Sequence, residues 1–196
     1  MEIKSAEFMK GVIGSEGLPE RDRPTIGFFD RSNVGKSSVI NALTKRKDLA
    51  RSSSRPGRTT EINYFLINDA WYLADLPGYG YAKLPLAKRE KLRKHVLWYA
   101  GTPDDVRLDL AVLVIDAGVG MTASDTEAYD MLRDAGRSVV ILANKSDKGR
   151  RNDITNSIRT LRENAPDAEI IRYSAKTGEG RAELLKVVST HVGFKR

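Results

Sequence analysis

The sequence predicts a three-layer α/β fold, with a mostly parallel central sheet that contains one antiparallel strand and helices on both faces. Strand-like apolar runs alternate with segments of helical length along most of the chain. Two of these runs, residues 110–116 and 138–144, are nearly continuously apolar, which is typical of parallel strands buried on both faces. In such sheets ligands bind beyond the carboxyl ends of the strands, so chemistry is expected in the loops that follow them.

The elements begin after a polar, proline-flanked stretch. We expect residues 1–23 to be an N-terminal arm leading into a single globular domain, residues 24–196. The apolar residues 25–29 predict a strand, and residues 36–44 predict a helix with Val39, Ile40 and Leu43 available for the core. Residues 48–60 are polar, carry glycine and proline, and are expected to form a mobile loop.

A hairpin follows this loop. Residues 61–76 contain two runs of aromatic and branched side chains, separated by Asn68 and Asp69. This pair tolerates the positive φ angles of a tight turn, so the two strands should be antiparallel neighbours. Beyond the two buried strands, residues 169–174 predict the last strand and residues 181–192 the closing helix.

The composition restricts the chemistry. There is no cysteine, which excludes disulfides, thiolate metal sites and cysteine nucleophiles. His95 and His191 are the only imidazoles and are expected to be packing or surface residues. No apolar run is long enough for a signal peptide or a membrane span, so we expect a cytoplasmic protein without a membrane partner. The formal net charge of +7 favours a polyanionic partner, although a basic solvated surface accounts for it equally well.

The loop after the first strand of the domain contains the pattern of a phosphate-binding loop. Asn33 to Ser37 reads N-V-G-K-S, the end of the motif G-x-x-x-x-G-K-[ST]. Backbone N–H groups at a helix N-terminus can bind phosphate, Lys36 adds a positive charge, and the Ser37 hydroxyl can ligate Mg²⁺. The first glycine of the motif is replaced by Asp30. Taken alone, this degenerate motif could also be a glycine turn that enters a helix.

A second motif, D-x-x-G, lies at the end of the third predicted strand. Its carboxylate, Asp75, can hold Mg²⁺ through water, and the N–H of Gly78 can approach a terminal phosphate closely. A lone D-x-x-G is weak evidence. Its place 40 residues after Gly35, at a strand end, gives it weight.

The third and fourth motifs point to guanine. Asn144 to Asp147 reads N-K-S-D, in which one carboxylate can accept from both N1–H and the exocyclic amine of guanine, a donor pair that adenine lacks. The apolar stem of Lys145 can lie against the base, and Asn144 can tie this loop to the phosphate loop. The backbone N–H groups of residues 174–176 can face guanine O6. Four motifs in this order at successive strand ends predict a guanine-nucleotide site.

Together the motifs resemble the EngB family of bacterial ribosome-biogenesis GTP-binding proteins, which are P-loop GTPases. The resemblance rests on RSNVGKSSVINALT, RPGRTT, DLPGYGYAK, NKSDK and SAKTGEG, which lie between residues 31 and 180. It implies the three-layer P-loop GTPase fold, GTP or GDP as ligand, Mg²⁺ as cofactor, and hydrolysis of GTP to GDP and phosphate. Within it, Thr59 matches the switch threonine that closes on Mg²⁺ and the γ-phosphate, with Thr60 a weaker candidate.

The resemblance and the motifs give a set of expected site residues. The catalytic group is Lys36, Thr59, Gly78 and Asn33, and the metal ligands are Ser37, Thr59 and Asp75. The nucleotide-binding residues are Asp30, Arg31, Ser32, Asn33, Val34, Gly35, Lys36, Ser37, Ser38, Gly57, Arg58, Thr59, Asp75, Gly78, Asn144, Lys145, Asp147, Ser174, Ala175 and Lys176.

Two positions bear on the rate of hydrolysis. Asn33 matches an asparagine that helps related GTPases to coordinate K⁺ beside the phosphates. Tyr79 follows the D-x-x-G, where many GTPases carry a glutamine that positions the attacking water. Since tyrosine cannot polarise water in the same way, slow intrinsic hydrolysis is expected, accelerated by K⁺ or by a partner.

The resemblance also implies a cellular role, in late assembly of the large ribosomal subunit and in cell division and septation. Basic residues that could contact ribosomal RNA lie in both expected switch regions. They are Arg51, Arg55, Arg58, Lys83, Lys88, Arg89, Lys91, Arg93 and Lys94. The helix after the second switch should bury Leu92, Val96 and Tyr99 and turn much of this charge outward. No DNA partner is expected, and the protein is expected to be a monomer.

Alternatives stay open from the sequence for the basic helix, for the activity and for Asp30. The basic helix face is equally well explained as ordinary solvated charge. The protein could be a binding module with little hydrolysis, or an ATP-using kinase, although a kinase has no use for Asn144 to Asp147. The carboxylate of Asp30 is expected either to turn outward, toward an arginine, or to face the phosphates and weaken binding.

Overall fold

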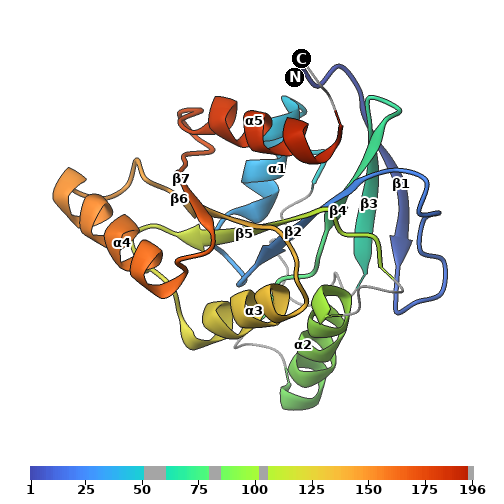
Figure 1. The fold of residues 1–196 in the computed structure, drawn as a ribbon, viewed down its shortest axis with the longest axis horizontal. Coiled ribbons are helices and arrows are strands. Elements are labelled where there is room, and N and C mark those ends of the chain that lie inside the picture. Colours follow the sequence, from blue (N-terminus) through green and yellow to red (C-terminus); the bar gives the residue numbers. More distant parts are fainter. Residues whose placement is uncertain (51–60, 80–84, 102–105, 194–196) are drawn as a thin grey trace.

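The computed structural model describes residues 1–50, 61–79, 85–101 and 106–193 (Figure 1). Its middle layer is a seven-stranded sheet in the order β1-β3-β4-β2-β5-β6-β7. The strands are β1 (Ala6–Val12), β2 (Thr25–Asp30), β3 (Ile62–Ile67), β4 (Trp71–Asp75), β5 (Leu110–Asp116), β6 (Val139–Asn144) and β7 (Glu169–Arg172). The helices are α1 (Lys36–Thr44), α2 (Leu86–Gly101), α3 (Ala123–Asp134), α4 (Arg151–Asn164) and α5 (Arg181–His191).

The direction of the strands confirms the predicted sheet. β3 pairs antiparallel with both of its neighbours, β1 and β4, whereas the pairs from β4 to β7 are parallel. β3 therefore runs against the other six strands. The strands β2 and β4 are buried along their whole length, and β5 and β6 almost so, as nearly continuous apolar runs predict.

Helices cover both faces of the sheet (Figure 1). On one face α1 and α5 pack through Val39, Ile40, Leu43, Leu184 and Val188. On the other face α2, α3 and α4 pack through Val96, Tyr99, Ala128, Leu132, Ile154 and Leu161. Because α1 follows β2 on one face while α2 follows β4 on the other, the carboxyl edge between these strands is left open for a ligand.

The β3–β4 hairpin has the turn that the sequence predicts. Ile67 pairs with Trp71, and between them Asn68 and Asp69 have φ angles of 53° and 52°. Asparagine and aspartate adopt this left-handed region more readily than other residues with a side chain. The turn therefore fixes the register of the two strands.

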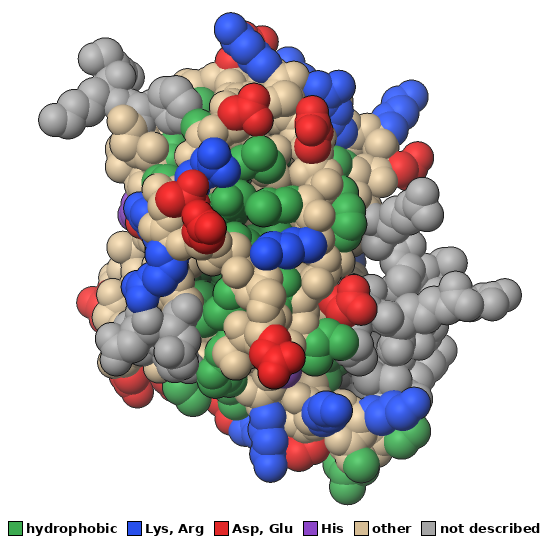
Figure 2. Space-filling model, turned by 90° about the vertical axis from the view of Figure 1, so that its right-hand side faces the viewer, with side chains coloured by type: hydrophobic (Ala, Val, Ile, Leu, Met, Phe, Trp, Pro, Cys, Tyr) green, Lys and Arg blue, Asp and Glu red, His purple; other side chains and the backbone are tan. Residues whose placement is uncertain are grey.

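The edge strand β1 was not predicted. The interpretation of residues 1–23 as an arm missed it, because three consecutive residues, Glu7, Phe8 and Met9, are exposed and the strand shows no alternation. A bulge between Phe8 and Lys10 breaks its register with β3. Figure 2 views the molecule from this side, where hydrophobic side chains lie between charged ones. A bulge and flanking charges are common protections of an exposed sheet edge.

The N-terminal segment is attached to the hairpin turn by one side chain. The Asn68 Oδ1 accepts hydrogen bonds from the backbone N–H groups of Lys4 at 2.7 Å and Ser5 at 3.0 Å. Its Nδ2 donates to the carbonyl of Glu2 at 2.8 Å. Asn68 thus serves both the turn conformation and the docking of β1.

The two roles of Asn68 can be separated by substitution. We expect Asn68→Gly, which keeps the positive φ and loses the three side-chain hydrogen bonds, to lower the free energy of unfolding by about 1 to 2 kcal/mol. Asn68→Ala should lower it by about 1 kcal/mol more, because alanine resists the positive φ. Urea unfolding measures the loss, and amide exchange at Lys4 and Ser5 locates it. Asp69→Gly is the control and should not destabilise; an unfolding midpoint of Asn68→Gly equal to that of the wild type would contradict the docking role.

Candidate nucleotide site

Three loops at the carboxyl edge of the sheet meet at one buried amide. The Asn144 Nδ2, at the end of β6, donates to the carbonyl of Val34 in the phosphate loop at 2.9 Å. Its Oδ1 accepts from the N–H of Ala175, after β7, at 3.3 Å. Asn144 is 2% exposed, so it is a fixed joint between the loops that follow β2, β6 and β7. This confirms the link from Asn144 to the phosphate loop that the sequence predicts.

The phosphate loop has the backbone shape of an anion site. Gly35, the N-cap of α1, has a φ of 102°, and a Cβ there would lie 2.7 Å from the Asn144 Nδ2. Both facts require glycine at this position. The helix begins at Lys36 without an acidic residue in its first turn. Its first N–H groups have no intrahelical acceptor and, with the helix dipole, favour an anion at this end.

The lysine of the loop lies between two carboxylates. The Lys36 Nζ donates to Asp75 Oδ1 and is 3.5 Å from Asp30 Oδ1. All three residues are buried. Burial alone lowers the pKa of Lys36, but the charges of Asp30 and Asp75 outweigh it and raise the pKa above its usual value. The ammonium group is therefore charged at neutral pH and balanced by carboxylates where a phosphate is expected.

The carboxylate of Asp30 points into the site. It does not turn outward to an arginine, which corrects one of the two outcomes expected from the sequence: its partner is Lys36. Asp30 is 5% exposed, and its Oδ1 has no hydrogen bond within the described part of the chain. Burial raises the pKa of Asp30, and Lys36 offsets only part of this effect. The aspartate is thus a poorly compensated buried acid at the place of a glycine.

The D-x-x-G segment lies directly against the phosphate loop. The Tyr79 N–H donates to the Asp30 carbonyl at 3.0 Å, and the Ser32 N–H donates to the Tyr79 carbonyl at 3.2 Å. A Cβ on Gly78 would lie 3.0 Å from both Asp30 Oδ1 and Ser32 Oγ, so only glycine fits without displacement. The side chain of Tyr79 is buried, and its hydroxyl donates to Asp125 Oδ1 of α3 at 3.2 Å.

The region expected to bind the base is held by polar side chains. The Lys145 Nζ donates to the Asn33 carbonyl and to Asp116 Oδ2, each at 2.8 Å. The Ser174 hydroxyl donates to Asp147 Oδ1 at 2.7 Å. This hydrogen bond is the main cause that lowers the pKa of Asp147, so the carboxylate is ionised and able to accept hydrogen bonds at neutral pH.

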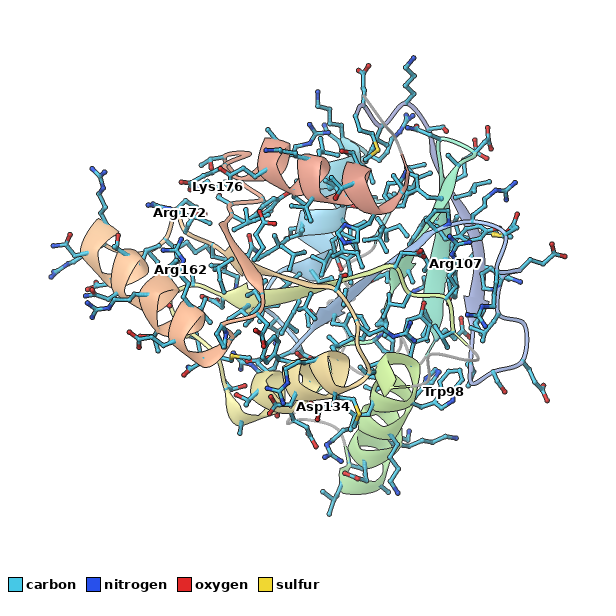
Figure 3. All side chains as sticks on the ribbon, viewed as in Figure 1. Trp98, Arg107, Asp134, Arg162, Arg172 and Lys176 are labelled. Carbon is cyan, nitrogen blue, oxygen red and sulfur yellow. The ribbon has the colours of Figure 1, made fainter. Side chains whose placement is uncertain are left out.

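Two of the three backbone N–H groups that are expected to face guanine O6 already donate to acceptors within the protein. The Ser174 N–H donates to the Glu179 carbonyl at 3.1 Å, and the Ala175 N–H donates to Asn144 Oδ1. A base that uses the Ala175 N–H has to share it with Asn144. Figure 3 labels Lys176 beside Arg172, at the β7 edge of the molecule.

Asp116 is a site residue that the sequence reasoning missed. Besides binding Lys145 it accepts from the Gly118 N–H through Oδ1 at 2.9 Å, so the carboxylate is oriented from two sides. It fixes the lysine whose stem is expected to pack on the base. The available signal was an acidic residue that ends the apolar run 110–116, the same position in its strand that Asp75 has in β4.

The side chains of Ser37 and Asp75 are of the chemical type that binds Mg²⁺. Mg²⁺ binds through one or two protein oxygens together with phosphate oxygens and water, and Ser37 with Asp75 supplies a hydroxyl and a carboxylate. Asp75 ends β4, and Ser37 lies in the first turn of α1 beside Lys36, which itself contacts Asp75. The remaining predicted ligand, Thr59, lies outside the described residues, as do Gly57 and Arg58.

The remaining residues singled out from the sequence lie in different surroundings. Arg31 pairs with α3: its Nε is 3.7 Å from Asp125 Oδ2. Ser38 and Lys176 are exposed. His95 accepts from the Gly14 N–H at 3.1 Å and His191 contacts its own helix, so both histidines serve packing.

The comparisons with known proteins bear on the family of the chain. A family model described as 50S ribosome-binding GTPase matches residues 25–145, and the model of the elongation factor Tu GTP-binding domain matches residues 106–193. A probable GTP-binding protein EngB of Chlorobaculum tepidum is 42% identical over 97% of this chain and 98% of its own. The EngB relative from Pelotomaculum thermopropionicum is 40% identical over 99% and 98% of the two chains. The chain belongs to the EngB family of GTP-binding proteins.

Solved structures agree on the fold. The crystal structure of a probable GTP-binding protein engB, 25% identical, superposes with a TM-score of 0.71 over 87% of this chain and 99% of that one. Aquifex aeolicus Era, crystallised with GDP and AlF₄⁻, is 22% identical and has a TM-score of 0.62 over 85% of this chain and 56% of its own. As a member of the EngB family the protein is a P-loop GTPase with the three-layer fold. None of the described helices is long and apolar enough to cross a bilayer.

The effect of Asp30 on nucleotide binding can be measured directly. We expect Asp30→Gly to tighten binding of both GDP and GTP on the order of tenfold, because it removes a negative charge near the phosphates and frees Lys36. Titration with fluorescent nucleotides gives the two affinities. Asp30→Asn keeps the bulk and removes the charge, so an effect confined to Asp30→Gly assigns the cause to bulk. Unchanged affinity in both variants would show that the loop tolerates aspartate.

Asp30 also makes stability depend on pH. Because its pKa is raised above 3.8, the folded protein holds a proton there at pH values where the unfolded chain has lost it. The contribution of Asp30 to the free energy of unfolding therefore falls as pH rises from about 3.8 through the folded-state pKa, and is constant above. Asp30→Asn lacks this contribution, so its stability relative to the wild type should rise across that window. Urea unfolding of nucleotide-free protein between about pH 4 and 8 tests this, and a pH-independent difference would contradict it.

Proposed function

We propose that this EngB-family GTPase is a cytoplasmic switch that hydrolyses GTP slowly, uses Mg²⁺, and assists assembly of the large ribosomal subunit, with a consequent need for it in cell division and septation. The observation that carries the nucleotide part is the joint at Asn144, which brings the phosphate loop and both base-binding loops together. The ribosomal part is supported by the description of the matching family model as a 50S ribosome-binding GTPase.

The residues divide the work on the nucleotide. Lys36 and the N–H groups that begin α1 bind the phosphates, and Asp147 selects guanine. When bound, Mg²⁺, held by Ser37, Asp75 and Thr59, neutralises charge on the phosphate oxygens. When a nucleotide binds, its phosphates replace Asp30 and Asp75 as the partners of Lys36. Binding therefore exchanges the ion pairs of Lys36 with carboxylates for ion pairs with phosphate.

Slow hydrolysis is supported by the orientation of Tyr79. Its side chain is 4% exposed and bonded to Asp125, so it does not replace the glutamine that orients water in other GTPases. Asn33 is exposed in the loop with a φ of 73°, so its side chain is free to approach an ion beside the phosphates. We propose K⁺ as that ion.

Contact with ribosomal RNA is supported by a basic stripe on α2. Lys88, Lys91 and Lys94 are exposed and three residues apart, which places them within about a third of the helix circumference. The opposite side of this helix buries Leu92, Val96 and Tyr99, as predicted. In the same helix Arg93 is bound to Glu127 and Glu90, so it is less available to a partner.

Hydrolysis is tested by phosphate release from GTP in Na⁺ and in K⁺, with and without large ribosomal subunits. We expect slow release in Na⁺ and an acceleration of about tenfold in K⁺, equivalent to about 1.4 kcal/mol of activation free energy. Asp147→Asn is the specificity control: an asparagine cannot accept both guanine donors, so GTP binding should fall without a gain for ATP. Rapid release in Na⁺ alone would contradict the assignment of Tyr79, and no release under any condition would favour a binding module.

The ribosomal contact is tested by charge reversal. Replacing Lys88, Lys91 and Lys94 by glutamate should weaken co-sedimentation with large subunits in the GTP state and reduce its salt dependence. The matched control reverses three exposed arginines of α4, Arg151, Arg159 and Arg162, the last of which is labelled on that helix in Figure 3. Equal loss in both triple variants would indicate non-specific attraction by the net charge.

A further inference from the structure

A buried carboxylate outside the known motifs joins three segments around the phosphate loop. Asp125 lies in the first turn of α3 and is 1% exposed. Its Oδ2 accepts from the Thr122 N–H at 2.9 Å and the Thr122 hydroxyl at 2.7 Å. The Tyr79 hydroxyl donates to Oδ1 at 3.2 Å, and Arg31 Nε lies 3.7 Å from Oδ2.

Of these contacts of Asp125, only those with Thr122 are needed to cap the N-terminus of α3. The two bonds with Thr122 cap the helix, as a capping box does in many proteins. Tyr79 and Arg31, however, belong to the D-x-x-G segment and the phosphate loop, which are 46 and more residues away in sequence from Asp125. A cap does not need these two partners, so their presence indicates a role toward the site.

The contact fixes Tyr79 in a defined place. Burial, with the charge of Asp125 adding to it, raises the pKa of Tyr79 well above its usual value, so the phenol stays protonated and donates. The ring also borders a pocket of ≈ 290 Å³ between α2 and α3, so it is not packed tightly on every side. Its hydroxyl bond to Asp125 and its backbone bonds to Asp30 and Ser32 therefore anchor it.

The position of Tyr79 determines that of Gly78, which precedes it. Gly78 lies against Ser32 and Asp30 in the phosphate loop, and its N–H is the group expected to approach the terminal phosphate. Only GTP carries that phosphate. Loss of the Tyr79 hydroxyl bond loosens the placement of Gly78, while the backbone bonds of Tyr79 to Asp30 and Ser32 in the phosphate loop remain. The binding of GTP is therefore affected more than the binding of GDP.

We propose that Asp125 is a positioning residue for GTP recognition, which acts through Tyr79 and Arg31 to hold Gly78 at the phosphate loop and so favours GTP over GDP. This inference rests on the proposed function of the site. It assigns to α3 a part in discriminating between nucleotides, beyond its place in the core.

The test compares affinities for GDP and for a non-hydrolysable GTP analogue in Tyr79→Phe and Asp125→Asn. Tyr79→Phe removes only the hydroxyl, and Asp125→Asn removes the charge while keeping an acceptor. In both we expect GDP affinity within about twofold of the wild type and affinity for the analogue reduced about three- to tenfold, because only part of the energy of the lost hydrogen bond acts on the contact with the terminal phosphate.

Two controls separate positioning from general stability. Tyr64→Phe removes another buried tyrosine hydroxyl bond, the 2.8 Å contact with Tyr99, away from the loop. Tyr72→Phe removes a second tyrosine hydroxyl, which accepts from Arg23 at 3.0 Å near the start of β4, away from the carboxyl edge of the sheet. Both should lower the melting temperature and leave the ratio of the two affinities unchanged.

The outcomes are distinct. If Tyr79→Phe and Asp125→Asn weaken GDP and the analogue equally, or change only the melting temperature, the positioning role is overturned. If Asp125→Asn does not fold, Tyr79→Phe alone decides in the same way. If the wild type binds neither nucleotide, the proposed function fails, and this inference with it.

Discussion

The hydrogen bonds of one buried amide, Asn144, hold the site together. The carbonyl of Val34 and the N–H of Ala175 come from loops that are far apart in the sequence, and Asn144 is a partner of both. Loss of such an amide leaves buried polar groups unsatisfied, which costs about 1 to 3 kcal/mol for each group. The nearby backbone is adapted to it, because Gly35 leaves the space that the amide occupies. The phosphate and base regions are therefore parts of one rigid unit.

Within this unit the charges are arranged around Lys36. Its ammonium group lies between Asp75, a predicted ligand of Mg²⁺, and Asp30, which occupies the place of a glycine in the motif. A buried cation without a partner would be strongly unfavourable, so carboxylates stabilise the nucleotide-free site. One ammonium group faces two carboxylates, so the cluster carries an excess of negative charge. Burial raises the pKa of Asp30, and Lys36 offsets only part of this effect. The aspartate at position 30 thus adds a buried, poorly compensated acid to the loop.

The D-x-x-G segment is controlled from outside the site. Its backbone pairs with the phosphate loop, while the side chain of Tyr79 reaches Asp125 on α3. α3 also contacts the basic helix α2 through the ion pair of Arg93 with Glu127. The same helix α3 thus contacts both α2, through Glu127, and the D-x-x-G segment, through Asp125.

The sequence was sufficient to predict those elements that depend on local turn chemistry or on a regular pattern of apolar residues. Continuous apolar runs identified β5 and β6, the pair Asn68 and Asp69 identified the hairpin turn, and four motifs placed the site at the strand ends. It was insufficient for β1, an edge strand with a bulge and three consecutive exposed residues, because such a strand lacks the alternation that burial on one face produces.

By itself the sequence determined the fold class and the family, and it predicted which groups bind phosphate and guanine and in what order they occur along the chain. Only the tertiary structure decided that Asp30 faces Lys36, that Asp116 holds Lys145, and that Asp125 holds Tyr79. The residues of the last two pairs are 29 and 46 positions apart in the sequence. Whether they come into contact depends on how the helices and strands pack. For Asp30, six residues from Lys36, the deciding factor is burial: Asp30 is 5% exposed and its carboxylate lies close to Gly78 of the D-x-x-G segment.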